Sequence, residues 1–274
     1  MSIFHEYLRK TAKMLKGLYY RKRLEKAALI AGKSFHLSSN GFIFESESLK
    51  PKFYLPYYKS EFIQQTIVST GDYYDKSALG YVANVVMGGA VSKLIKGNYV
   101  LDIGANIGNH TLYFLFECGA AMVHCFEPIK ETYGFLQKNV ELNDLQDVTT
   151  LHNVGVGAKS SMANMVSFNS SNMGSTEIDY NESGDIPIVA IDDLQFERKI
   201  ALIKIDVEGF EYEVVKGMLK TVKRHSPYII IEIRDKFFND IEKILGSMGY
   251  WYINISKGNN YLFIPKHYPN HKES

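Results

Sequence analysis

From residue 98 onward, apolar and polar positions alternate in a regular order along the chain. Short apolar runs at 99–103 and 122–126 are each followed by a turn and then by a segment with helical periodicity. Short buried strands that alternate with helices build parallel sheets covered on both faces. The pattern therefore predicts an α/β fold with a doubly wound, mostly parallel, seven-stranded sheet. Further strands are expected at 148–154, 188–190, 201–205, 228–233, 250–255 and 261–264, and helices at 107–118, 128–142, 210–222 and 236–247.

The part of the chain before residue 98 is patterned differently. Residues 1–60 are interpreted as a basic helical extension, with a helix over 3–30 and breaks at Pro51 and Pro56. Residues 61–97 are interpreted as a helical cap or lid that precedes the first strand. The α/β domain then occupies 98–274, and a Ser-, Asn- and Gly-rich insertion at 158–185 is expected to form a hairpin.

Composition narrows the class of protein. The chain has 274 residues, of which 46% are hydrophobic and 22% charged, as in ordinary globular proteins. It shows no apolar run of about 18 residues and no secretory signal, and it has two cysteines, so we expect a cytoplasmic protein. Residues 1–33 hold nine Lys and Arg against two Glu, although the net charge is only +1. The remainder is net acidic, which argues against a nucleic acid partner.

A glycine-bearing turn follows the first predicted strand in the sequence Asp102-Ile103-Gly104-Ala105-Asn106-Ile107-Gly108. Gly104 permits a tight turn and close approach of a ligand, and Gly108 permits close packing of the next helix. The dinucleotide motif G-x-G-x-x-G has a second glycine where this chain has Asn106. The turn therefore favours a ligand without a pyrophosphate.

Glu127 stands at the end of the second predicted strand, 23 residues after Gly104. In open parallel sheets, a carboxylate at this place accepts hydrogen bonds from ribose hydroxyls. The glycine turn and the acidic strand end together predict an adenosyl ligand.

These segments resemble the FkbM family of S-adenosylmethionine-dependent methyltransferases. The resemblance rests on VLDIGANIG at 100–108, FEP at 126–128, KNVELN at 138–143 and KIDVEGFE at 204–211. It implies a class I methyltransferase fold, which is Rossmann-like, with S-adenosylmethionine as the cofactor and O-methylation of a sugar, glycan or glycosylated metabolite as the activity. By position, it implies that the methionine part of the cofactor is surrounded by Asp102, Gly104, Ala105, Asn106 and Gly108. It also implies that Glu127 holds the ribose, and that Pro128, Ile129, Asn143, Gly155 and Val156 border the adenine.

An acceptor hydroxyl is a weak nucleophile and needs a general base or a metal. We expect the base among carboxylates at the ends of the fourth and fifth strands: Asp206 first, then Glu208, then Glu232. Alternation also puts Glu232 on the same strand face as Arg234, so an ion pair between them is the alternative. Lys204 shares a face with Asp206 and is expected to orient it. No metal is expected; Asp206 and Glu232 are the pair that would bind magnesium if one is used.

Several alternatives stay open at this stage. The chain could instead methylate an amine or a protein, or act as a non-catalytic S-adenosyl-binding partner subunit. The expected partner is a sugar or glycoconjugate acceptor, bound by the insertion and the helices before residue 98. The basic N-terminal helix either contacts a membrane peripherally, which would place the enzyme at the inner membrane surface, or packs on the catalytic domain or on a second copy of it.

Overall fold

The computed structural model describes residues 35–38, 41–46, 49–80, 82, 90–167, 171–256 and 258–266. The helix predicted over 3–30 lies outside these residues. The chain forms two compact units, residues 1–74 and 75–274. Within the described residues, no helix is both long and apolar enough to cross a membrane.

The described residues of the first unit form a three-stranded antiparallel sheet in the order β1-β2-β3 and the helix α2. The elements are β1 (Phe35–Ser38), β2 (Gly41–Phe44), β3 (Phe53–Tyr54) and α2 (Phe62–Thr70). In the described part of residues 1–60, which the sequence analysis assigned to a basic helical extension with breaks at Pro51 and Pro56, the regular elements are strands. Alternating Phe42 and Phe44 are both buried, as the two-residue period of a strand requires. Glu61 caps α2 by accepting a hydrogen bond from the Gln64 backbone N–H at 2.9 Å.

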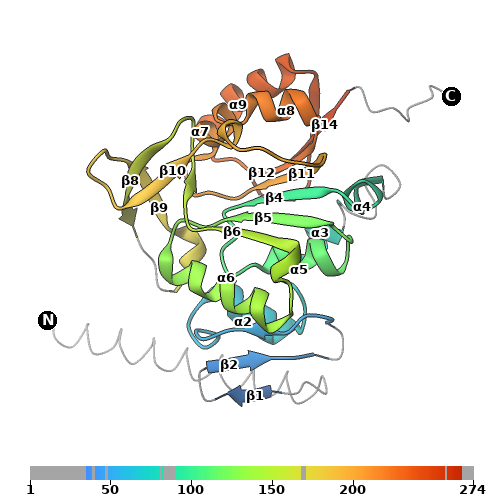
Figure 1. Cartoon of the computed structure of the whole chain (residues 1–274), viewed down its shortest axis with the longest axis vertical. Helices are drawn as coiled ribbons and strands as arrows, with labels where there is room; N and C mark the ends of the chain where they lie inside the picture. Colours follow the sequence, from blue (N-terminus) through green and yellow to red (C-terminus); the bar gives the residue numbers. More distant parts are fainter. Residues whose placement is uncertain are drawn as a thin grey trace, which may run out of the picture. The chain divides into compact units, whose positions relative to one another are not determined.

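The second unit is built on a seven-stranded sheet in the order β13-β14-β12-β11-β4-β5-β6 (Figure 1). All neighbouring strands run parallel except β14, which is antiparallel to both β12 and β13. This confirms the doubly wound, mostly parallel sheet. The strands are β4 (Tyr99–Ile103), β5 (Met122–Phe126), β6 (Thr149–His152), β11 (Ile200–Ile205), β12 (Tyr228–Glu232), β13 (Tyr250–Asn254) and β14 (Asn260–Pro265).

Helices cover both faces of this sheet. Figure 1 shows α5 and α6 on one face and α7, α8 and α9 on the other. The central strands β4 and β11 are buried along their whole length, as expected for strands covered on both sides. The helices are α3 (Lys76–Gly80), α4 (Ala90–Ile95), α5 (Asn109–Phe116), α6 (Lys130–Leu142), α7 (Glu211–Lys216), α8 (Leu219–His225) and α9 (Asp235–Ser247). Short 3-10 turns are η3 (Gln146–Val148), η4 (Met173–Ser175) and η5 (Ile191–Asp193).

The insertion forms part of a second, four-stranded sheet in the order β7-β10-β8-β9, which projects from the left of the main sheet in Figure 1. Its strands are β7 (Gly155–Val156), β8 (Ser161–Ser167), β9 (Glu177–Tyr180) and β10 (Ile186–Val189). Strands β8 and β9 pair antiparallel, so the expected hairpin is present. Ala163 of β8 and Ile186 and Ile188 of β10 form a small buried cluster with Ile129, the N-cap residue of α6.

Candidate active site

The glycine turn lies where β4 ends and α5 begins, at the centre of the sheet. Gly104 has φ +77°, and a Cβ at this position would overlap the backbone carbonyl of Asp206. Gly108 has φ +86°, and a Cβ there would lie 2.7 Å from Leu136 of α6. Asn106 also adopts a left-handed conformation, with φ +51°. Asparagine tolerates this region better than most residues, which explains how it replaces a glycine here.

Glu127 anchors this turn from the neighbouring strand. Its Oε2 accepts a hydrogen bond from the Asn106 backbone N–H at 2.9 Å, and its Oε1 accepts one from the Ile129 N–H at 2.9 Å. Burial raises the pKa of Glu127 to about 7, although both hydrogen bonds favour the ionised form. Each oxygen keeps a second lone pair, so the carboxylate can still accept two hydroxyl groups of a ligand.

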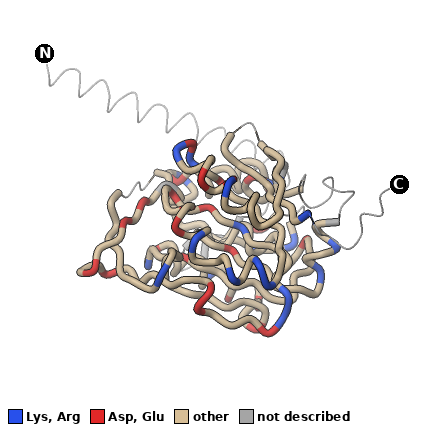
Figure 2. Tube along the Cα trace, turned by 90° about the horizontal axis from the view of Figure 1, so that it is seen from above, with Lys and Arg blue, Asp and Glu red and all other residues tan. Residues whose placement is uncertain are grey.

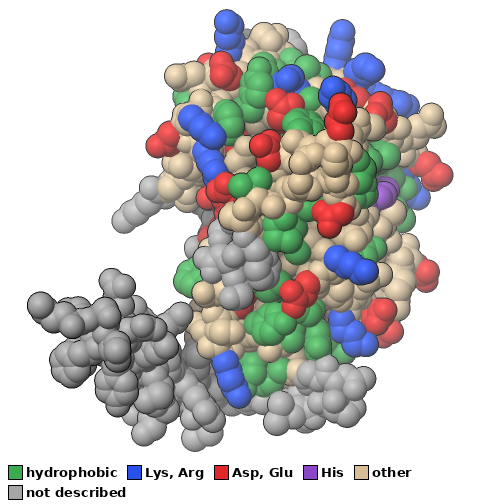
Figure 3. Space-filling model, turned by 90° about the vertical axis from the view of Figure 1, so that its left-hand side faces the viewer, with side chains coloured by type: hydrophobic (Ala, Val, Ile, Leu, Met, Phe, Trp, Pro, Cys, Tyr) green, Lys and Arg blue, Asp and Glu red, His purple; other side chains and the backbone are tan. Residues whose placement is uncertain are grey.

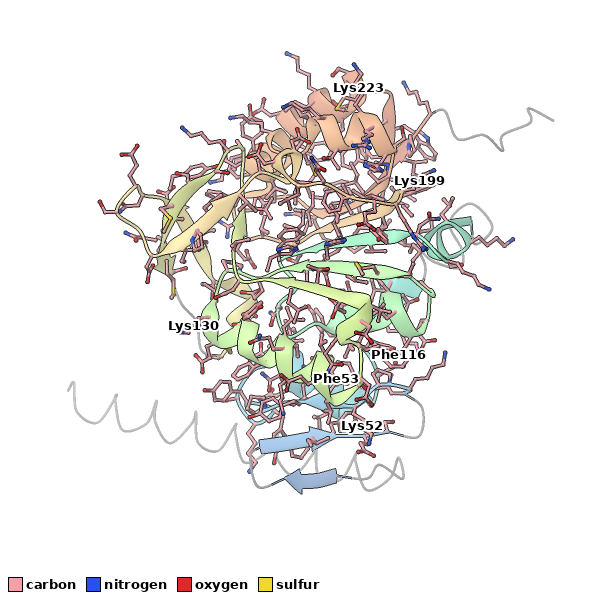
Figure 4. The ribbon with its side chains drawn as sticks, viewed as in Figure 1. Lys52, Phe53, Phe116, Lys130, Lys199 and Lys223 are labelled. Atoms are coloured by element: carbon pink, nitrogen blue, oxygen red, sulfur yellow. The ribbon has the colours of Figure 1, made fainter. Side chains whose placement is uncertain are left out.

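The residues expected around the adenine fall into two groups. Ile129 is the buried N-cap residue of α6, beside the exposed Lys130 that Figure 4 labels. Gly155 lies next to Pro128, because a Cβ on Gly155 would be 3.8 Å from the Pro128 Cβ. Gly155 and Val156 form β7, so these four residues gather at one end of the sheet.

Asn143 does not belong with them, and its assignment to the adenine pocket is corrected. It is the C-cap residue of α6, whose N-cap is Ile129. A helix of 13 residues rises by roughly 20 Å, so the two caps are that far apart. The Asn143 side chain donates to the Asn139 carbonyl at 2.8 Å, which is a structural role.

Lys204 is the central cation of the site. Its Nζ donates to Asp206 Oδ2 at 3.0 Å and to the Gly104 carbonyl at 3.3 Å, and it lies 3.8 Å from Asp102 Oδ1. Burial disfavours the ammonium, yet the carboxylates of Asp206 and Asp102 outweigh it and raise the pKa of Lys204. The other oxygen of Asp102, Oδ2, accepts from the Thr111 hydroxyl at 2.7 Å. Lys204 thus ties the glycine turn to the strand end that carries Asp206.

Glu232 ends β12, one strand beyond Asp206, and it makes no ion pair with any described residue. Glu232 is the exposed residue at the end of an otherwise buried strand. Crowding of its carboxylate by protein atoms and the negative charges of Asp206 and Glu208 raise its pKa to about 7. The pKa of Asp75 is also raised, by burial and by Asp206. Asp75 lies in the segment 61–97 that the sequence analysis interpreted as a cap or lid, but no local pattern predicted that its carboxylate would interact with Asp206.

Glu208 and Arg234 are paired with each other. Arg234 Nη2 donates to Glu208 Oε2 at 3.0 Å and to Glu177 Oε1 at 2.7 Å. The ion pair between Arg234 and Glu232, which strand alternation suggested as an alternative, is not formed. Arg234 pairs with Glu208 and Glu177 instead. Arg234 lies beyond the end of β12, where strand alternation no longer decides the direction of a side chain. Because the Glu208 carboxylate is occupied by Arg234, Glu208 is not among the foremost candidates to contact an acceptor.

Two further features bear on chemistry at this end of the sheet. Burial and the Lys204 ammonium hold the pKa of His110 well below its usual value, so that its imidazole is neutral. Among the described residues, no group of three or more His, Cys, Asp or Glu is arranged to hold a metal ion.

The sequence profile of the methyltransferase FkbM domain matches residues 102–252, which is more than half of the chain. The chain belongs to the FkbM methyltransferase family. The matched segment contains the glycine turn, Glu127, Asp206 and Glu232. Family membership and the seven-stranded, mostly parallel sheet with helices on both faces together confirm the predicted fold class.

Individual relatives are distant. Methyltransferase 1 of Beauveria bassiana is 24% identical over 44% of this chain and 58% of its own length. Methyltransferase sdnD of Sordaria araneosa is 24% identical over 47% of this chain and 63% of its own length. The aligned region thus spans less than two thirds of either fungal protein.

Solved structures are similar at the same distant level. Methyltransferase FkbM from Methylobacillus flagellatus matches 61% of this chain and 43% of its own, with 21% identity and a TM-score of 0.45. The M. jannaschii TYW2 structure in complex with AdoMet matches 83% of this chain and 85% of its own, with 14% identity and a TM-score of 0.41.

Proposed function

We propose that this protein is an S-adenosylmethionine-dependent O-methyltransferase that methylates a hydroxyl of a sugar, glycan or glycosylated metabolite. Membership of the FkbM family supports methyl transfer. The arrangement of carboxylates at the ends of β11 and β12 supports a hydroxyl acceptor. The observation that carries the proposal is the carboxylate of Glu232, which forms no ion pair with any described residue and whose pKa is raised to about 7. Its strand, β12, lies next to β11, which pairs with the strand that precedes the glycine turn.

The residues of the turn fit the proposed cofactor. Glu127 is fixed by two backbone N–H groups and can accept the two ribose hydroxyls. Asp102 Oδ1 is buried and accepts no hydrogen bond from a described residue, so it suits a ligand ammonium. Gly104, Ala105, Asn106 and Gly108 leave room for the methionine part, and Pro128, Ile129, Gly155 and Val156 lie where the adenine would pack. When bound, the cofactor supplies a methyl group that is already activated on a sulfonium.

The protein then has to align the acceptor and remove its proton. General bases work best when their pKa lies near the working pH, and the pKa of Glu232 meets this condition. Asp206 is committed to Lys204, so we assign it to orienting the acceptor and Glu232 to taking the proton. This reverses the order expected from the sequence, where Asp206 came first.

Charge supports a neutral acceptor such as a sugar. Asp75, Asp206 and Glu232 surround one paired cation, Lys204, and this local charge would repel phosphates. Carboxylates accept hydrogen bonds from sugar hydroxyls, and each charge-assisted bond contributes about 1.5–3 kcal/mol when buried. Figure 2 shows acidic and basic residues interspersed over the described chain, without the long basic stripe of a nucleic acid-binding surface.

The test is transfer of a radiolabelled methyl group from S-adenosylmethionine to matched panels of neutral sugars, phosphorylated sugars, amines and unmodified protein. Label in a neutral sugar or glycan is the expected result. Glu232→Gln should lower turnover about 10²- to 10⁴-fold. Asp240→Asn, on the exposed side of α9, should leave turnover unchanged. Label found only in amines or proteins would contradict the proposal, as would a Glu232→Gln variant with normal turnover.

The N-terminal segment suggests where such an enzyme would work. Its nine Lys and Arg in 33 residues would attract anionic lipid by about 1 kcal/mol for each residue near the surface. The alternative is that this segment packs on the catalytic domain or on a second copy of the chain. Co-sedimentation with phosphatidylserine vesicles, for the full chain and for a variant lacking residues 1–31, separates the two. A full chain that stays in the supernatant at low salt would contradict the membrane proposal.

A further inference from the structure

One arginine joins three segments of the FkbM domain that are far apart in the sequence. Arg234 Nη2 donates to Glu177 at the start of β9 and to Glu208 in the loop after β11. Arg234 itself lies between β12 and α9, where it is the N-cap residue of the helix. We call Glu177, Arg234 and Glu208 the arginine bridge. It connects the insertion to the loop that carries Asp206.

The local backbone is shaped to receive this guanidinium. Gly209 has φ +86°, and a Cβ there would lie 2.9 Å from Arg234 Nη1 and 3.2 Å from its Cζ. The absent side chain lets the flat guanidinium lie against the loop backbone. The Gly209 N–H donates to Glu211 Oε1 at 2.8 Å, which orients the peptide at the start of α7.

A second contact joins the same two segments. The rings of Tyr180 in β9 and Phe210 in the loop have centroids 4.8 Å apart. The Tyr180 hydroxyl also accepts a hydrogen bond from the Ala158 backbone N–H at 3.0 Å. Strand β9 therefore holds residues 208–210 at two points, one polar and one apolar.

The loop at 206–210 also contacts the glycine turn. The Asp206 backbone N–H donates to the Ile103 carbonyl at 3.0 Å, and the Asp206 carbonyl fills the space that a Gly104 Cβ would need. Asp206 also bonds to Lys204, which bonds to the Gly104 carbonyl. A continuous set of contacts thus runs from β9 through Arg234 and the loop to the proposed cofactor site.

We infer that Glu177 and Arg234 are positioning residues: the arginine bridge uses the insertion to fix the 206–210 loop, and through it the cofactor turn and the acceptor carboxylates. This inference rests on the proposed function only for its effect on ligand affinity. The side chains of Glu177, Arg234 and Glu208 are about one third exposed. Pairs of this kind add little to global stability, so the bridge acts on the position of the loop rather than on folding. Figure 3 shows the molecule from the side on which the insertion projects in Figure 1, where acidic and basic side chains stand among hydrophobic ones.

The first test needs no ligand. Hydrogen–deuterium exchange of the full chain is compared between wild type and Glu177→Gln, which keeps the shape of residue 177 and removes its charge. Exchange in peptides covering 206–210 should rise several-fold, although the substitution is in another strand, while the melting temperature changes little. The matched control is Glu141→Gln, which breaks the exposed Lys138–Glu141 pair on α6 and should leave exchange at 206–210 unchanged.

The second test measures S-adenosylhomocysteine affinity by calorimetry. In 50 mM salt, Glu177→Gln should weaken binding by about fivefold. In 1 M salt, screening should bring wild type and variant together. Arg234→Met should weaken binding at least as much, and adding Glu177→Gln to it should cause no further loss.

Two results would overturn the arginine bridge as a positioning device. One is unchanged exchange at 206–210 in Glu177→Gln. The other is additive effects of Glu177→Gln and Arg234→Met on affinity. If wild type fails to bind S-adenosylhomocysteine, the proposed function fails. The exchange measurement needs no ligand, so it still shows whether the arginine bridge positions the 206–210 loop.

Discussion

The Glu127 carboxylate accepts the backbone N–H of Asn106 at 2.9 Å and so joins the ends of β5 and β4. This contact explains why an asparagine can occupy the position of the second glycine. Its backbone N–H points at the carboxylate while its own Oδ1 accepts the Ile107 N–H at 2.7 Å. The carboxylate proposed to hold the ribose is therefore itself part of the turn.

The raised pKa of Glu127 makes cofactor binding depend on pH. The free protein holds a proton on Glu127 below about pH 7, whereas ribose hydroxyls donate to the ionised form. Affinity for S-adenosylhomocysteine should therefore rise from pH 5 to 7, by up to about tenfold per pH unit, and level off above 8. Calorimetry at constant ionic strength checks this. Glu127→Gln should bind more weakly with a flatter pH profile, and an unchanged profile would show that another group causes the titration.

Substituting Gly104 or Gly134 by alanine should have opposite effects, because a Cβ is blocked at Gly104 and has free space at Gly134. A Cβ at Gly104 overlaps the Asp206 carbonyl in a left-handed backbone, whereas a Cβ at Gly134 within α6 meets nothing within 4 Å. Gly104→Ala should therefore abolish measurable S-adenosylhomocysteine binding and lower stability. Gly134→Ala should stabilise the protein by about 1 kcal/mol, because alanine has the higher helix propensity. Denaturation in urea measures both, and a Gly104→Ala variant with normal stability and binding would contradict the close approach.

Replacing Lys204 should destabilise the fold, because Asp102 would then be a buried carboxylate without its counter-charge. In Lys204→Met, Asp102 stays fully buried with no cation within 4 Å in the described structure. Loss of one partner of a buried ion pair costs about 3–5 kcal/mol. The loss of stability should be larger at high pH than at low pH. Burial raises the pKa of Asp102, so at low pH the variant can neutralise this carboxylate with a proton, whereas at high pH the buried charge stays without a counter-charge. Urea denaturation at pH 5 and pH 8 measures this, with the exposed Lys130→Met as control; a loss independent of pH would contradict the explanation.

Two histidines should make the fold sensitive to acid. The ring of His152 stacks on Phe126 at 4.5 Å, and His124 lies 6.1 Å from His152. Burial and the neighbouring His152 lower the pKa of His124 to about 4, and burial lowers that of His152. Below about pH 6.5 the unfolded chain binds protons first, so the free energy of unfolding should fall between about pH 6.5 and 4. His124→Phe should make this slope shallower in urea titrations; an unchanged slope would assign the acid sensitivity elsewhere.

The sequence predicted most of the main sheet because each central strand is a short, mostly apolar run next to a turn. Strands β4 and β5 coincide with the expected 99–103 and 122–126. The helix expected at 210–222 is instead two helices, α7 and α8, which are divided near Gly217. A Cβ at Gly217 would overlap the carbonyl of Gly157, so the break is set by a contact with a distant segment. Local periodicity carries no signal for such a contact.

The site shows the same limit. Glu127 and the glycine turn could be found from spacing, because both lie at strand ends whose positions the sheet fixes. The partners of Arg234 could not, because Glu177 lies 57 residues away in an insertion without a clear pattern. The proposed rank of Glu232 above Asp206 also depends on the fold, because the carboxylates of Asp206, Glu208 and Asp75 that raise the pKa of Glu232 come from other segments.

We propose that this FkbM chain holds an S-adenosyl ligand through Glu127. Calorimetry of the full chain with S-adenosylmethionine, S-adenosylhomocysteine and NAD, in wild type and in Glu127→Ala, measures this binding. Both S-adenosyl ligands should bind wild type and NAD should not. Glu127→Ala should weaken S-adenosyl binding by a few kcal/mol, because two charge-assisted hydrogen bonds of roughly 1.5–3 kcal/mol each are lost. Tight binding of NAD without S-adenosyl binding, or a folded Glu127→Ala variant with unchanged affinity, would contradict the claim.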